Sequence, residues 1–109
     1  MNIAYKTQNV IQVNSSGITL FTADLYSIID SIFITNTTRE SILINVQFLR
    51  EGKSPTFLFN NYKLSEHATV ELMKNSALYL QPTDSLIGCS DYSRHLFDCH
   101  ISYREVLEE

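Results

Sequence analysis

Residues 41–50 read SILINVQFLR, and the spacing of their apolar residues decides the fold. Successive side chains of a β-strand point to opposite faces, so the four apolar residues at every second position from Ile42 to Phe48 would share one face. In a helix the same residues would be scattered around the axis. The segment therefore predicts a strand with one buried side. Leu43 and Leu49 fall on the other side, which we expect to be partly covered as well.

The same alternation recurs near the C-terminus, where Phe97, Cys99 and Ile101 alternate with polar residues. Residues 27–35 are rich in β-branched side chains, which favour strands. The isoleucines at 29, 32 and 34 can share one face only if a β-bulge interrupts this strand near Asp30 and Ser31. Shorter strands are expected at 9–13, 17–22, 56–59, 77–80 and 85–90.

Residues 65–74 fit either a helix capped by Ser65 or a strand, and the alternation of Ala68, Val70 and Leu72 favours the strand. About eight short strands, separated by turn residues, predict an all-β fold. We expect an antiparallel two-sheet β-sandwich of the jelly-roll or immunoglobulin-like kind.

The length of 109 residues corresponds to a single domain. We expect residues 1–109 to form one β-sandwich domain, with 1–13 as an N-terminal arm and 104–109 as a C-terminal tail. The formal net charge is −4 and the charges are scattered, so no nucleic-acid partner is expected. No apolar run approaches the ~20 residues that cross a bilayer, and the N-terminus lacks a signal-peptide layout, so no membrane partner is expected.

The two cysteines and three histidines leave three interpretations of the thiols open: core residues, a disulfide or a metal site. Cys89 and Cys99 are ten residues apart, which is not the short paired spacing of metal ligands. We favour core thiols, with both side chains pointing inward and His100 pointing away from the core. No metal and no cofactor are expected.

Catalytic signatures are weak. His67 with Glu66 and Glu71 could form an acid–base pair, but solvated charges at a turn or strand edge are the better interpretation. No serine or cysteine stands in a nucleophile motif, and no glycine-rich phosphate loop is present. A small hydrolase or isomerase on a jelly roll would need clustered histidines and carboxylates, so we do not expect an enzyme.

Surface contacts are the more promising chemistry. Apolar residues on the second faces of strands and at the termini predict an interface between subunits. The terminal strands also show few of the features that protect sheet edges from pairing. The predicted interface residues are Val10, Ile11, Val13, Leu43, Leu49, Val106 and Leu107.

Tyrosines at strand ends and turns give an alternative function, that of a carbohydrate-binding module. In that function Tyr62, Tyr79 and Tyr92 would stack on sugar rings. The absence of tryptophan counts against it.

One succession of segments resembles a known family. It comprises residues 17–22, 27–37, 42–48, 68–72, 78–86 and 100–103. The middle of this pattern reads SIFITNT at 31–37, then VEL at 70–72 and LYLQPTDSL at 78–86. This resembles small β-sandwich virion proteins of tailed bacteriophages, found at the neck, the tail or the head surface. The sequence departs from that pattern at Asp24, where a loop glycine is usual, and in its acidic tail.

The resemblance implies a structural protein without active-site residues. Its partners would be copies of itself, in a homo-oligomeric ring or array, and other virion proteins. It would be located in the virion after synthesis in the host cytoplasm.

Overall fold

The computed structural model describes residues 2–107, which form nine strands and no helix. No helix that could cross a membrane is therefore present in that part of the chain. The strands are β1 (Asn2–Val13), β2 (Ile18–Thr22), β3 (Ser27–Asn36), β4 (Ile42–Leu49), β5 (Thr56–Leu64), β6 (Thr69–Glu71), β7 (Leu78–Leu80), β8 (Ser85–Ser90) and β9 (Phe97–Leu107).

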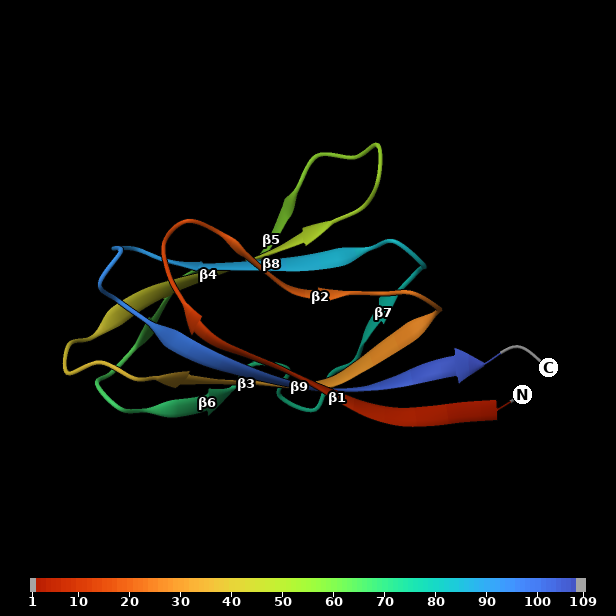
Figure 1. Cartoon of the computed structure of the whole chain (residues 1–109), viewed down its shortest axis with the longest axis horizontal. Coiled ribbons are helices and arrows are strands. Elements are labelled where there is room, and N and C mark those ends of the chain that lie inside the picture. The colour runs from red at the N-terminus through yellow and green to blue at the C-terminus, as the bar shows by residue number, and fades with distance from the viewer. Residues whose placement is uncertain (1, 108–109) are drawn as a thin grey trace.

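The strands make two antiparallel sheets that pack face to face (Figure 1). Sheet A has the order β1-β9-β3-β6, with β7 pairing a different part of β3, and sheet B has the order β2-β8-β4-β5. The molecule is elongated along the strands, with extents of 48 × 28 × 20 Å. The all-β, two-sheet sandwich is confirmed, with nine strands in place of about eight.

The core lies between the sheets and is built from the alternating apolar residues that the sequence predicts to be buried. Ile42, Ile44 and Val46 are almost fully buried, as predicted. Phe48 is only half-buried, because it lies at the end of β4, where the Arg50 guanidinium packs 5.2 Å from its ring centroid. The predicted bulge is confirmed: the pairing of β3 with β9 shifts register between Ile29 and Ser31.

Residues 69–71 form a short strand, β6, which confirms the strand interpretation for part of 65–74. Leu72 and Met73 come directly after β6, and both side chains are buried in the core. The Glu71 carboxylate accepts hydrogen bonds from the backbone N–H groups of Ile32, Met73 and Lys74 at 2.8, 3.0 and 2.7 Å. Burial alone would raise the pKa of Glu71, but these three donors outweigh it and lower the pKa. Glu71 is thus a structural residue.

Two polar residues, Asn36 and Asp84, are buried and hold loops in place. The Asn36 side chain, fully buried, donates to the carbonyls of Glu40, Leu64 and Ser65. The Asp84 carboxylate accepts from the Arg50 guanidinium at 2.8 Å, which lowers the pKa of Asp84. Burial of a polar group is costly unless it is hydrogen-bonded, so both residues serve the fold.

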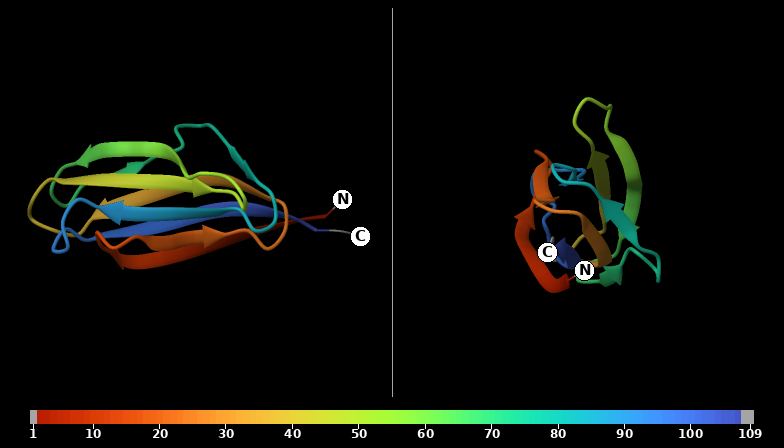
Figure 2. Two further views of the ribbon diagram at one scale, coloured as in Figure 1. Left: turned by 90° about the horizontal axis from the view of Figure 1, so that it is seen from above. Right: turned by 90° about the vertical axis from the view of Figure 1, so that its right-hand side faces the viewer.

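The terminal segments differ from the expectation. Asn2–Val13, expected as an arm, is a strand that pairs with β9 of the same chain. Residues 104–107, expected as part of a tail, belong to β9, which lies between β1 and β3 and is not an edge strand. Residues 108–109 lie outside the described residues. The ends of β1 and β9 run out side by side beyond the rest of the sandwich (Figure 2).

Candidate functional site

The predicted interface residues on β1 have different environments. Val13 is fully buried, so it does not present its side chain to a partner, whereas Val10 is half-buried and packs against the core. The prediction for Val13 is wrong, because a bulge after Val10 turns the chain so that Val13 enters the core opposite Phe97. Ile11 lies within that bulge and is 70% exposed.

The other predicted interface residues lie on different surfaces. Leu43 and Leu49 are half-buried on the outer face of sheet B. Val106 and Leu107 are half-buried where β9 pairs with the start of β1. The structure therefore does not bring the predicted set together into one surface.

The three tyrosines of the glycan hypothesis are also separated. Tyr62 packs against the core, edge-on to Phe59 with 6.3 Å between ring centroids, so it is not a stacking platform. The ring of Tyr92 contacts the Arg94 guanidinium at 5.7 Å and His95. Tyr79, on the outer face of sheet A, is 70% exposed. Of the three, only Tyr79 offers a ring without such an aromatic or cationic neighbour.

Exposed apolar side chains gather on the outer face of sheet A. Because Val10 and Cys99 face the core, the odd-numbered residues of β1 before the bulge face outward. Of the eight large apolar side chains exposed among residues 2–107, five lie on this face. They are Ile3, Tyr5, Ile11, Phe33 and Tyr79.

One half of this face is a hollow that we name the Ile11 patch. Ile11 and Phe33, the latter 42% exposed, line it together with His100, and its volume is about 240 Å³. His100 is exposed, as predicted, and its Nδ1 forms a hydrogen bond with the Asn9 side chain on the neighbouring strand. Asn9 also lines the hollow, and the remaining lining residues are Thr35, Asp98 and Cys99. Two large apolar groups thus flank a polar pair on an open surface.

The other half carries the tyrosine row, which we define as Tyr5, Arg104, Ile28 and Tyr79. These residues are direct neighbours in register across β1, β9, β3 and β7. Tyr5 is 80% exposed. The Arg104 guanidinium donates to both carboxylate oxygens of Asp30, at 2.8 and 3.0 Å, and this pairing raises the pKa of Arg104.

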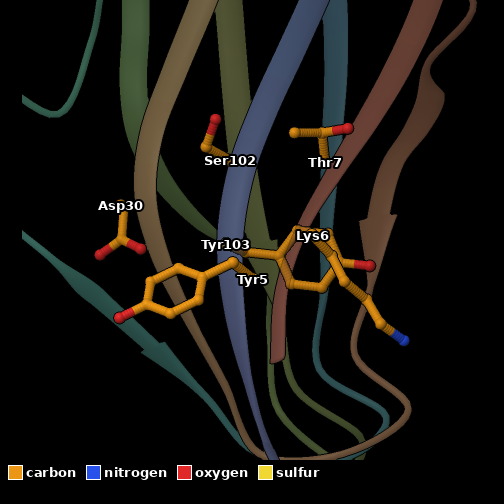
Figure 3. Close-up of a pocket in the computed structure, with 6 residues that line it drawn as sticks. All are labelled: Tyr5, Lys6, Thr7, Asp30, Ser102 and Tyr103. Atoms are coloured by element: carbon orange, nitrogen blue, oxygen red, sulfur yellow. The ribbon is translucent and has the colours of Figure 1, made fainter. Parts of the chain in front are cut away.

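A hollow of about 550 Å³ adjoins the tyrosine row. The Tyr5 side chain reaches from β1 across β9 toward Asp30, and the Thr7 and Ser102 hydroxyls lie on the same side of the sheet (Figure 3). Lys6 and Tyr103 complete the lining. The Lys6 ammonium is paired with Glu105 at 2.7 Å. The hollow therefore combines an aromatic ring with several hydrogen-bonding groups.

The two cysteines are free and lie in different sheets. Cys99 is in the core, as predicted, and burial raises the pKa of its thiol to about 12. Cys89, predicted to point inward, is half-buried on the outer face of sheet B. Its neighbours Gly88 and Ser90 take the buried positions, because Gly88 lies directly against Leu20.

His95 is buried in the loop before β9 and holds two loops together. Its Nδ1 is 2.8 Å from Asp91 Oδ1, and its Nε2 is 3.3 Å from Glu40 Oε2. The Asp91 hydrogen bond raises the pKa of His95 more than burial lowers it, and Glu40 adds to the rise. Both ring nitrogens are occupied by carboxylates, which leaves neither free to act as a general base.

Among residues 2–107, no three histidines, cysteines or carboxylates are grouped so that they could hold a metal ion. His67 is exposed and has positive φ (54°) in a turn.

The outer face of sheet A carries most of the exposed apolar side chains and the two hollows described above, so it is the candidate functional site.

Comparison with known proteins informs the fold. No protein-family model and no curated protein matches the sequence. A solved structure is similar over 97% of this chain and 89% of the other, with a TM-score of 0.65 and 8% sequence identity. The description of that structure reads "Bacillus endospore appendages form a novel family of disulfide-linked pili". At this identity the likeness shows a shared fold.

Proposed function

We propose that this chain is a non-enzymatic structural subunit that assembles with copies of itself through the Ile11 patch. The observation that supports it most strongly is the pair of exposed apolar side chains, Ile11 and Phe33, that flank the Asn9–His100 hydrogen bond on the outer face of sheet A. Contiguous exposed apolar surface rimmed by polar groups is characteristic of protein interaction sites. Burying Ile11 and Phe33 would remove apolar area from water, and the Asn9–His100 pair at the centre would supply hydrogen bonds.

Pairing along the β1 edge is the less favourable route to assembly. Lys6 points to the inner side of this edge strand, where it is held by Glu105. The bulge at Ile11 and Gln12, with φ of 55° at Gln12, interrupts the ladder further along. Inward-pointing charges and bulges are both devices that protect sheet edges. The edge is thus better protected than the sequence predicts, and contact through the face is favoured.

We further propose that this assembly is part of a bacteriophage virion, where it forms a ring or array and also contacts other virion proteins. It is supported by the sequence pattern at 31–37 and 78–86, whose buried Asn36 and Asp84 hold loops of the sandwich. The proposed location is the virion, after synthesis in the host cytoplasm. A surface appendage is the second candidate, because the similar solved fold is described as a pilus. Immunogold labelling distinguishes the two by decorating either released virions or cell-attached fibres.

Disulfide links are not part of the proposed assembly. The Cys99 thiol is buried and protonated at neutral pH, which makes it a poor nucleophile for exchange. Cys89 lies on sheet B, away from the Ile11 patch. We expect oligomers of this chain to persist in the presence of a reductant such as dithiothreitol.

Sedimentation velocity over a concentration series tests the proposal. Phe33→Asp on sheet A should abolish self-association, because a carboxylate would be desolvated in the contact. Phe57→Asp is the matched control, since Phe57 is a phenylalanine of similar exposure, 51%, on the outer face of sheet B. Circular dichroism checks that both variants keep the sandwich. A wild-type chain that stays monomeric at high concentration, or equal loss in both variants, would contradict the proposal.

A further inference from the structure

We propose that the tyrosine row on sheet A binds a neutral oligosaccharide, with Tyr5 and Tyr79 as its two stacking platforms. This is a second surface, separate from the Ile11 patch, and it pairs Tyr79 with a partner that the sequence did not suggest. Both rings are largely exposed, at 80% for Tyr5 and 70% for Tyr79. They stand on the same face, at opposite ends of one register row.

The spacing of the platforms sets the length of the ligand. Three inter-strand steps of about 4.8 Å separate their backbones, which gives roughly 14 Å. Because the Tyr5 side chain reaches across β9, the two rings lie closer together than the backbones, and an extended chain of about two to three sugar rings would contact both. Between the backbones of the two tyrosines lie Ile28, which is half-buried, and Arg104, whose guanidinium is paired with Asp30. A sugar chain can therefore lie across the strands and contact both rings.

The polar groups beside the row suit hydroxyl ligands. Arg104 and Asp30 form a fixed donor–acceptor pair with side chains 29% and 36% exposed, so both can bind a further partner. The Thr7 and Ser102 hydroxyls line the adjoining hollow. Sugar hydroxyls both donate and accept, and can satisfy all four groups at once.

The pairing of the charged side chains at this hollow favours an uncharged ligand. Arg104 is balanced by Asp30, and Lys6 is balanced by Glu105. Both cations at this hollow are thus paired, and neither is left free to attract a sulfated or carboxylated sugar. The same balance argues against a subunit contact here, because a second protein surface would have to desolvate the Arg104–Asp30 pair and replace its water contacts.

The test is an NMR titration of the ¹⁵N-labelled full chain with maltotriose, cellotriose, xylotriose and N,N′,N″-triacetylchitotriose. We expect at least one trisaccharide to shift the amide resonances of the tyrosine row and of Ser102. Tyr5→Ala and Tyr79→Ala should each weaken that binding about tenfold, as expected for loss of one aromatic contact of about 1.4 kcal/mol. Tyr92→Ala is the matched control, because Tyr92 is also exposed (58%) but lies in the loop at the other end of the sandwich (Figure 1).

The outcomes separate this site from the assembly surface. Phe33→Asp should leave the affinity of a monomer for the trisaccharide unchanged. Absence of shifts with all four probes, or equal weakening by Tyr92→Ala, would overturn the glycan site while leaving the assembly proposal standing. Loss of self-association in Tyr5→Ala and Tyr79→Ala, without any sugar binding, would reassign the row to a subunit contact.

Discussion

Along β9, residues that face sheet B and residues that face outward have opposite properties. Phe97, Cys99 and Ile101 are at most 3% exposed and fill the core. Their outward neighbours His100 and Arg104 form hydrogen bonds with side chains of the adjacent strands. One strand therefore contributes stability through one face and contact chemistry through the other. Substitutions one residue apart should separate folding from function.

Ile101→Ala should have the largest effect. Ile101 is fully buried between two strands of sheet A and packs in the core. Its truncation should lower the free energy of unfolding by about 2–5 kcal/mol, measured by urea denaturation of the monomer. His100→Ala, one residue away on the exposed face, should change it by less than about 0.5 kcal/mol. Similar losses in the two variants would refute the division between the faces.

Gly88→Ala extends the comparison to sheet B. An added Cβ would lie 2.8 Å from Leu20 Cδ1 in the core, so we expect a loss of about 1–3 kcal/mol from overpacking. Cys89→Ala, on the outer face beside it, should be nearly neutral. Combining Gly88→Ala with Leu20→Val should recover part of the loss. No recovery would mean that the glycine is needed for another reason.

A smaller effect is expected in the pH dependence of stability, through His95 and its two carboxylate partners Asp91 and Glu40. Arg94 also contacts Glu40, at 3.5 Å. The pKa of His95 is raised in the folded state, so its contribution is complete below its unfolded pKa, near 6.5. That contribution is lost as the pH rises through the folded pKa. We expect the melting temperature of the wild type to approach that of His95→Gln between pH 6 and 9. A constant difference would show that His95 is not charged in the fold.

The sequence predicts those elements whose residues alternate cleanly. The run from Ile42 to Val46 and the bulge near Asp30 follow from periodicity, because one buried face forces every second residue to be apolar. The Cys89 error has the same origin. In β8, Leu86, Ile87, Gly88 and Cys89 do not alternate in polarity, so the sequence does not show that Leu86 and Gly88, the latter against Leu20, form the inner face.

The candidate site is less predictable than the core. The residues of β1 before the bulge lie at the edge of sheet A and are exposed or half-buried on both sides of the strand, so they need no alternation. Tyr5 is therefore not recognisable as a neighbour of Tyr79, which is distant in sequence. Their proximity comes from the order β1-β9-β3 with β7 on β3. No local pattern encodes that order.

Site-specific photo-crosslinking tests the central claim most directly, namely that copies of the chain meet through the outer face of sheet A. A photoreactive p-benzoylphenylalanine would replace Phe33 on sheet A or, as a control, Phe57 on sheet B. Both positions are exposed, so both report on the surface without disturbing the core. We predict that irradiation yields covalent oligomers from position 33, with crosslinks mapping to residues near Ile11 and His100 of a second copy, and none from position 57. Crosslinked oligomers from position 57 alone would contradict the account.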